Sequence, residues 1–270
     1  MDKPQGRRRF LRNLTALGAA GSVPAAIASN EAQAQHTGHS HVAQATTVAR
    51  PAAAPAVGQA YKYFTQPEVD FVEAAVARLI PADDLGPGAK EAGAAYFIDG
   101  QLIGPWGTMA RQYRLGPWPE GTPQQGYQSP LTPQEVYRVA IREVNLHCRK
   151  QYSKTFDALT AEQQDEVLRG LDTGKVELQS VRAQFFFNLL LNNTIEGFFS
   201  DPMYGGNRDK VGWKLVGFPG VAAVYTEYID KHGVPYRAEP VSILDIHHKL
   251  AQVDEHGHPV HVLIADKGKE

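Results

Sequence analysis

Apolar residues recur at helical spacing in four stretches of the chain, and start signals precede most of them. These stretches predict helices over residues 65–80, 89–102, 132–147 and 160–174. In a capping box, an N-cap hydroxyl and a polar side chain three residues later each bond the other residue's backbone N–H. Three of the predicted helices begin with this pattern, at Thr65 with Glu68, Thr132 with Glu135 and Thr160 with Gln163. Pro81 ends the first helix, because proline cannot continue the backbone ladder.

A fifth stretch, 181–199, is largely apolar and is the best candidate for a central helix. Two long segments, 104–130 and 200–220, are rich in Gly, Pro and aromatic residues and predict ordered irregular loops. Strand-like patterning is confined to a short run at 260–264. The sequence therefore predicts a mainly α fold, a helical bundle with long Gly-, Pro- and aromatic-rich loops.

Composition fits one globular domain with a segment of different character at each end. Of the 270 residues, 43% are hydrophobic, which is enough for a sizeable core. The 27 basic and 29 acidic residues nearly cancel, so nucleic acid is not an expected partner. The single cysteine, Cys148, excludes an intramolecular disulfide and a four-cysteine zinc site. The expected parts are a signal, a linker, a helical domain and a polar C-terminal tail, at 1–34, 35–60, 61–230 and 231–270.

The first residues have the pattern of an export signal. A twin-arginine pattern is formed by Arg7, Arg8, Phe10 and Leu11. An apolar stretch at 14–28 follows and is too short to span a bilayer comfortably. Ala32 and Ala34 provide the small residues that a signal peptidase needs, so cleavage is expected after Ala34 and the periplasm is the expected destination. An uncleaved anchoring helix is the alternative interpretation.

Sequence motifs of common catalytic centres are absent from the chain. There is no glycine-rich dinucleotide fingerprint, no phosphate loop, no H-E-x-x-H and no G-x-S-x-G. The C-x-x-C-H attachment site for haem c is missing as well. We therefore expect no catalytic residue, cofactor site or metal site in this chain.

Two groups of residues keep alternative functions open. Asp83 and Asp84 are adjacent carboxylates that could act as acid and base in a stand-alone enzyme, although capping and loop hydrogen bonds explain them more simply. Histidines gather near both ends and could make the chain a periplasmic metal-binding module, although solvated flexible segments are the simpler explanation. They are His36, His39 and His41 in the linker, and His247, His248, His256, His258 and His261 in the tail. Cys148, within a predicted helix, is expected to be a small core residue.

Two loop motifs resemble those of a known family. The first runs from Ile80 to Gly93 and continues to Asp99. The second, which is more specific, lies within 196–220 and contains Asp201, Pro202, Tyr204, Gly205, Gly206, Asn207, Trp213, Phe218 and Pro219. Together they resemble the gluconate 2-dehydrogenase subunit 3 family, and the resemblance covers about 65–225.

The resemblance implies a small subunit that has no catalytic centre of its own. In this family the small subunit accompanies a large flavoprotein that binds FAD and oxidises a sugar, a sugar acid or a polyol. Electrons commonly pass to a multi-haem cytochrome c subunit. The small subunit carries the export signal and supports maturation and stability of the flavoprotein, so the complex is expected in the periplasm, peripheral to the inner membrane.

The residues of the second motif also have a physical interpretation. Its paired glycines permit positive backbone dihedral angles or close approach of another backbone segment. Its aromatic residues are of the kind enriched at the buried centre of protein interfaces. The same aromatic residues could equally pack the loop onto its own bundle, and the sequence leaves both interpretations open.

Overall fold

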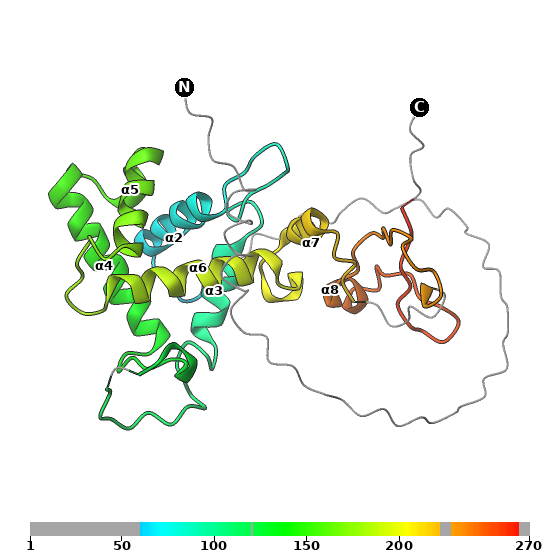
Figure 1. The fold of residues 1–270 in the computed structure, drawn as a ribbon, viewed down its shortest axis with the longest axis horizontal. Coiled ribbons are helices and arrows are strands. Elements are labelled where there is room, and N and C mark those ends of the chain that lie inside the picture. Colours follow the sequence, from blue (N-terminus) through cyan, green and yellow to red (C-terminus); the bar gives the residue numbers. More distant parts are fainter. Residues whose placement is uncertain (1–59, 120, 222–227, 265–270) are drawn as a thin grey trace. The chain divides into compact units, whose positions relative to one another are not determined.

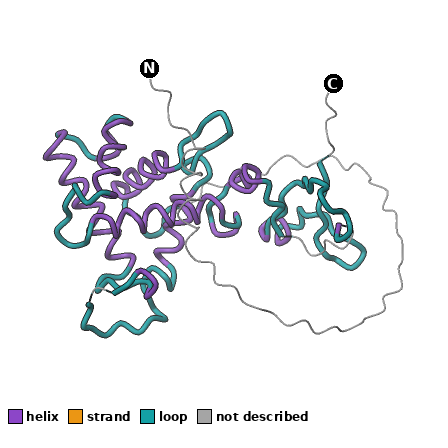
Figure 2. The backbone as a smooth tube through the Cα atoms, viewed as in Figure 1, coloured by secondary structure: helices purple, strands orange, loops and turns teal. Residues whose placement is uncertain are grey.

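The computed structural model describes residues 60–119, 121–221 and 228–264, which belong to one compact unit, Ala60–Glu270. Its α-helices are α2 (Gln66–Leu79), α3 (Ala94–Ile103), α4 (Pro133–Tyr152), α5 (Ala161–Asp172), α6 (Ala183–Phe199), α7 (Val211–Val216) and α8 (Ile243–His247). Irregular segments join them, and no strand is drawn in the described ranges (Figures 1 and 2). The prediction of a mainly α fold is confirmed. The twin-arginine pattern and the predicted linker lie outside the described residues, apart from Ala60.

The predicted helix starts are confirmed because local hydrogen bonds fix them. Thr65 and Glu68, Thr132 and Glu135, and Thr160 and Gln163 each form a capping box. In the first box the Glu68 carboxylate accepts a 2.8 Å hydrogen bond from the Thr65 backbone N–H. Arg138 of α4 reaches the same carboxylate at 2.7 Å, so the start of α2 is also tied to a helix far along the chain.

Helix α6 lies at the centre of the fold, as its apolar sequence predicts. It contacts α2, α3, α4 and α5, and Figure 1 shows it crossing among them. The core contains fully buried aromatic rings, with Phe71 4.7 Å from Phe156 and Tyr137 5.7 Å from Phe186 between ring centroids. Burial of each such side chain contributes about 1.5–3 kcal/mol. Within the described residues, no helix combines the length and apolarity needed to cross a membrane.

One buried carboxylate fastens the segment before α2 to α3. Asp99 is 2% exposed and accepts hydrogen bonds from the backbone N–H groups of Lys62, Tyr63 and Phe64, at 2.7, 3.0 and 2.8 Å. Three donors are a nearly complete set for one carboxylate. The chain is therefore held against the bundle before its first described helix begins.

Several predicted boundaries differ from the structure. Helix α3 begins at Ala94 rather than at residue 89, because Gly93 has φ 76° and ends a turn there. Helix α4 continues past His147 to Tyr152 and stops where Ser153 takes a left-handed conformation. The predicted loop at 200–220 contains α7, a short helix that Gly217 ends with φ 70°.

The predicted polar tail contains folded structure. Val241 and Ser242 are buried, and Ser242 caps α8 in a capping box with Asp245. The strand-like run at 260–264 forms only an isolated bridge, between Ala238 and Leu263. Residues 238–264 are therefore held by irregular contacts and one short helix.

Candidate functional site

The second motif begins where α6 ends, and its polar side chains build the turn that follows. The Asp201 carboxylate accepts a 3.0 Å hydrogen bond from Met203 N–H and caps a short 3-10 turn, η3 (Pro202–Tyr204). Asn207 is completely buried and has φ 46°, which its residue type tolerates. Its side-chain amide donates to the Ser200 carbonyl and its oxygen accepts from Gly212 N–H, both at 2.8 Å. Asp201 and Asn207 are therefore structural groups of the loop.

The glycines of this loop allow its backbone to lie directly on α6. A Cβ at Gly206 would come within 2.2 Å of the Gly197 carbonyl oxygen, and one at Gly212 within 2.1 Å of the Phe198 carbonyl oxygen. Real Cβ atoms do not approach so closely. Gly205, with φ 96°, satisfies the other requirement for glycine, a left-handed backbone.

The aromatic residues of the motif divide into an inner and an outer set. Trp213 is 6% exposed and its indole N–H donates to the Phe199 carbonyl at 2.6 Å, so it packs the loop onto the bundle. Tyr204 and Phe218, by contrast, are 51% and 47% exposed, and Met203, which precedes Tyr204 in the chain, is exposed too. Pro202 and Pro219 of the motif are half-buried. The packing interpretation holds for Trp213, and the interface interpretation stays a prediction for the exposed aromatic residues.

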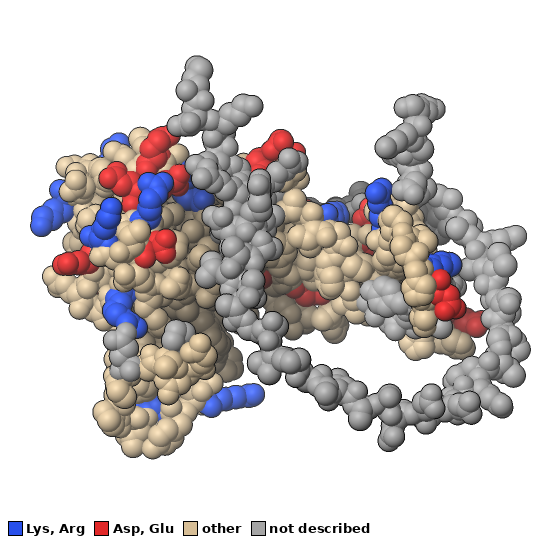
Figure 3. Space-filling view, in the orientation of Figure 1, with Lys and Arg blue, Asp and Glu red and all other residues tan. Residues whose placement is uncertain are grey.

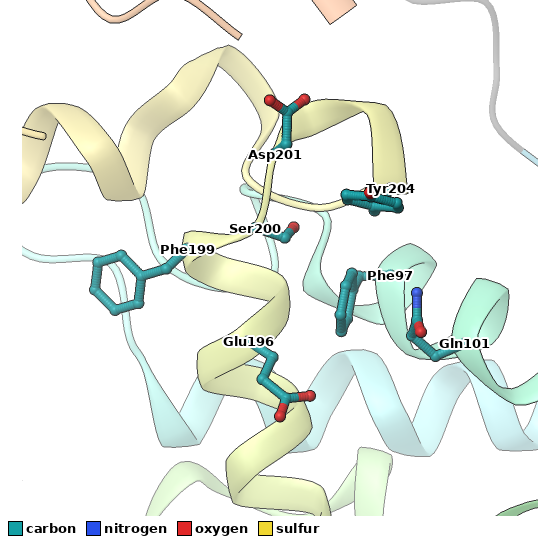
Figure 4. A pocket seen from close by; sticks show the side chains of 7 residues that line it. All are labelled: Phe97, Gln101, Glu196, Phe199, Ser200, Asp201 and Tyr204. Atoms are coloured by element: carbon teal, nitrogen blue, oxygen red, sulfur yellow. The ribbon is translucent and has the colours of Figure 1, made fainter. Parts of the chain in front are cut away.

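A pocket of about 450 Å³ opens between α3, the end of α6 and η3. It is lined by Phe97, Gln101, Glu196, Phe199, Ser200, Asp201 and Tyr204. Figure 4 shows Glu196, Phe97, Gln101 and Tyr204 gathered on one side, with the Phe199 ring and the Asp201 carboxylate directed away from them. Sequence analysis did not single out Phe97, Gln101 or Glu196 as site residues, although Phe97 and Glu196 belong to the two motifs and Gln101 lies two residues after the first.

Glu196 is the pocket residue whose side chain is best placed to bind a ligand group. Its side chain reaches solvent, yet protein surrounds its carboxyl group closely enough that desolvation raises its pKa above the ordinary value. Among the described residues, no hydrogen-bond donor or cation contacts this carboxylate. It is therefore available to a group that comes from outside the described chain.

Other polar groups of the motif hold the C-terminal segment. The Asp201 carboxylate accepts a 2.7 Å hydrogen bond from Ile243 N–H, and Lys210 Nζ lies 2.7 Å from the Asp245 carboxylate. Burial opposes ionisation of Asp245, but the hydrogen bonds from Lys210 and Ser242 outweigh it, and the pKa of Asp245 lies below its ordinary value. Asp201 thus connects the motif with a segment that sequence analysis placed in the tail.

The residues of the alternative enzyme hypothesis have local structural roles. The Asp83 carboxylate accepts a 3.0 Å hydrogen bond from Leu85 N–H, and Asp83 also forms an isolated bridge with Gly86. Asp84 is exposed in the same turn. Cys148 is buried, and burial raises the pKa of its thiol to about 11, as suits a core residue.

The described histidines do not converge on a common point. His258 contacts Asp254 at 3.2 Å, and His261 lies 2.6 Å from the Tyr236 hydroxyl. No group of three or more potential metal ligands occurs in the described ranges. The linker histidines lie outside them. On the face drawn in Figure 3, charges of both signs are interspersed over the helices at the left.

The fold and the site define a helical protein whose distinctive loop packs onto the central helix and leaves apolar side chains exposed. The sequence profile described as gluconate 2-dehydrogenase subunit 3 matches residues 66–220, more than half of the chain, and the chain belongs to this family. The family is named for one subunit of a multi-subunit dehydrogenase. No curated protein and no solved structure shows significant similarity to the chain.

Proposed function

We propose that this chain is the non-catalytic small subunit of a gluconate 2-dehydrogenase-like complex and supports maturation, export and stability of an FAD-binding flavoprotein subunit. The single observation that carries the proposal is the family match over 66–220, which includes the whole motif loop and the pocket beside it. FAD belongs to the flavoprotein in this proposal, and haem c to a cytochrome subunit.

The outer set of the motif supports a binding role. Met203, Tyr204 and Phe218 expose apolar surface on a loop that Asn207 and Trp213 hold in one conformation. A preorganised loop loses little conformational entropy on binding, and exposed aromatic side chains are frequent anchors of interfaces. We therefore assign the flavoprotein contact to this surface.

Export would follow from the twin-arginine pattern at the start of the chain. That pathway carries folded proteins, so a flavoprotein already loaded with FAD could cross the inner membrane together with this subunit. The complex would then work in the periplasm, attached to the inner membrane through its other subunits.

Co-expression with an FAD-binding flavoprotein, which the proposal expects to be encoded next to this chain, tests the proposal. The complex is purified through this chain, and the eluate is assayed for flavin absorbance and sugar-dependent dye reduction. Flavin and activity should co-purify, and Arg7→Lys with Arg8→Lys should stop export of both chains while they still bind each other. Purification of a stable lone chain, with normal flavoprotein maturation in its absence, would contradict the proposal.

A further inference from the structure

The pocket beside the motif combines one available carboxylate with aromatic walls. Phe97 is 8% exposed and Tyr204 51% exposed, so the pocket has one fixed ring and one accessible ring beside Glu196. Asp201 also lines the pocket, but its carboxylate is directed away and accepts hydrogen bonds from Met203 N–H and Ile243 N–H. Glu196 is therefore the acidic group that an incoming ligand meets.

A cation is the ligand that best suits this arrangement. Desolvation without a compensating donor makes the ionised form of Glu196 costly, and an incoming positive charge relieves that cost. Aromatic faces also attract cations, most strongly where water is excluded. An apolar group would leave the carboxylate without a partner and an anionic group would repel it, whereas a neutral donor could bond to it more weakly than a cation does.

Arginine fits the pocket better than lysine does. Its planar guanidinium can form two parallel hydrogen bonds to one carboxylate and stack on an aromatic ring, and its apolar stem can lie along the pocket wall. The pocket has a volume of about 450 Å³ and is open to solvent, so the end of a long side chain can reach it from outside.

We propose that this pocket receives an arginine side chain of the flavoprotein subunit, whose guanidinium pairs with the Glu196 carboxylate beside Phe97 and Tyr204. The proposal rests on the proposed function and adds to it the chemistry of the contact. It makes Glu196 a specificity residue for the partner, with the exposed Tyr204 of the motif lining the same pocket.

The test compares substitutions at Glu196 with matched substitutions at Glu177. Glu177 is another exposed glutamate with no polar partner among the described residues, and it lies before α6, outside the pocket lining. Affinity of the full chain for the purified flavoprotein is measured by interferometry at low and high salt. Glu196→Gln should raise Kd at least about ten-fold and Glu196→Lys more, because the arginine that the complex covers loses its charged partner. Glu177→Gln and Glu177→Lys should leave Kd within about two-fold of the wild-type value, as expected of rim charges.

A second measurement identifies the partner residue. A photo-crosslinking amino acid replaces Gln101, which lines the pocket, and the crosslinked flavoprotein peptide is found by mass spectrometry. We expect this peptide to contain an arginine. Exchange of the two charges, with Glu196→Arg in this chain and glutamate at that arginine, should then recover at least part of the lost affinity.

The outcomes separate this inference from the proposed function. Normal binding by both Glu196 variants, with unchanged thermal unfolding, would overturn the arginine contact while the subunit assignment stands. A crosslink to residues 1–59 of this chain, or to a flavoprotein segment without arginine, would overturn it as well. Failure of the wild-type chain to bind the flavoprotein would contradict both the proposed function and the arginine contact.

Discussion

Gly206 shows how a single missing Cβ determines the shape of the motif loop. Its backbone lies so close to the Gly197 carbonyl that an added methyl group cannot fit without a shift. Gly100, in the interior of α3, is a useful contrast because the nearest atom to its added Cβ is the Tyr204 carbonyl oxygen at 4.0 Å. Gly206 is required because there is no space for a Cβ, whereas Gly100 has space for one.

Alanine substitutions at these two positions should have opposite effects on stability. Gly206→Ala should lower the free energy of unfolding by about 1–3 kcal/mol, the usual cost of forcing extra volume into a packed site. Gly100→Ala should raise it by about 0.5–1 kcal/mol, since alanine favours the helix interior. Urea denaturation of both variants is the measurement. Equal effects of the same sign would show that the loop can move away from α6.

Cys148 should behave as a protected thiol. With a pKa of about 11, raised first by burial and then by nearby Asp157, it carries almost no thiolate at pH 8. Labelling by a thiol reagent at pH 8 should therefore be slow in the native protein and fast in urea. Because the pKa of the Cys148 thiol is raised by folding, its protonated form stabilises the folded state fully below about pH 8.5. This contribution to the free energy of unfolding is lost as the pH rises toward 11. Rapid native labelling would show that Cys148 is accessible.

The direction of side chains in the motif is what sequence could not predict. Trp213 and Phe218 are both aromatic and lie five residues apart, yet one is buried and the other exposed. Their orientations depend on α7 and on the left-handed Gly217, which ends that helix. A six-residue helix is too short to show a recognisable apolar period. The sequence therefore could not decide which aromatic residues pack inward and which face a partner.

At the scale of elements, helix starts were more predictable than helix ends. The capping boxes depend on residues three positions apart, so Thr65, Thr132 and Thr160 were identified from the sequence. The end of α4 depends on Ser153 in a left-handed conformation, which serine rarely adopts. The start of α3 depends on the turn at Gly93. Such left-handed backbone conformations depend on tertiary packing, and they produce no regular pattern in the sequence.

The contact between the motif and α8 should be breakable at Lys210. Lys210→Met keeps the apolar stem but removes the cation that faces Asp245, so amide hydrogen exchange at 241–246 should become at least several-fold faster. Exchange in α2, α3 and α6 should stay unchanged. Because the pKa of Asp245 is lowered, wild-type protection should persist at pH 5 and fade only below the ordinary carboxyl pKa of about 4. Unchanged exchange in the Lys210→Met variant would show that Asp201 alone holds residues 241–246 against the motif.

The pocket is a property of the whole molecule rather than of any motif. Phe97 and Gln101 come from α3, Glu196 from α6 and Tyr204 from η3, so only the packed structure brings them together. Periodicity predicted the existence of both helices. Periodicity could not predict that α3 and α6 leave a pocket open beside η3. The pocket depends on how closely the loop backbone packs on α6 at its glycines.

The exposed apolar surface of the motif should make the isolated chain self-associate. Tyr204 and Phe218 expose about half of their area, and such patches favour association unless a partner covers them. Sedimentation velocity should show concentration-dependent oligomers that Tyr204→Ser with Phe218→Ser reduces and the flavoprotein suppresses. Tyr113→Ser with Leu115→Ser, at even more exposed positions of the loop before α4, serves as the control and should not change flavoprotein affinity. A monomer at all concentrations would contradict this prediction.

The attachment of residues 241–245 to the motif has a consequence for chimeras with other family members. The family match ends at residue 220, which makes that position an inviting junction. A junction there would separate Asp201 from the Ile243 amide and Lys210 from its carboxylate, and would remove Val241, whose carbonyl lies against Gly220. The block that can be exchanged intact therefore extends past α8, and recombination within it should yield poorly folded hybrids.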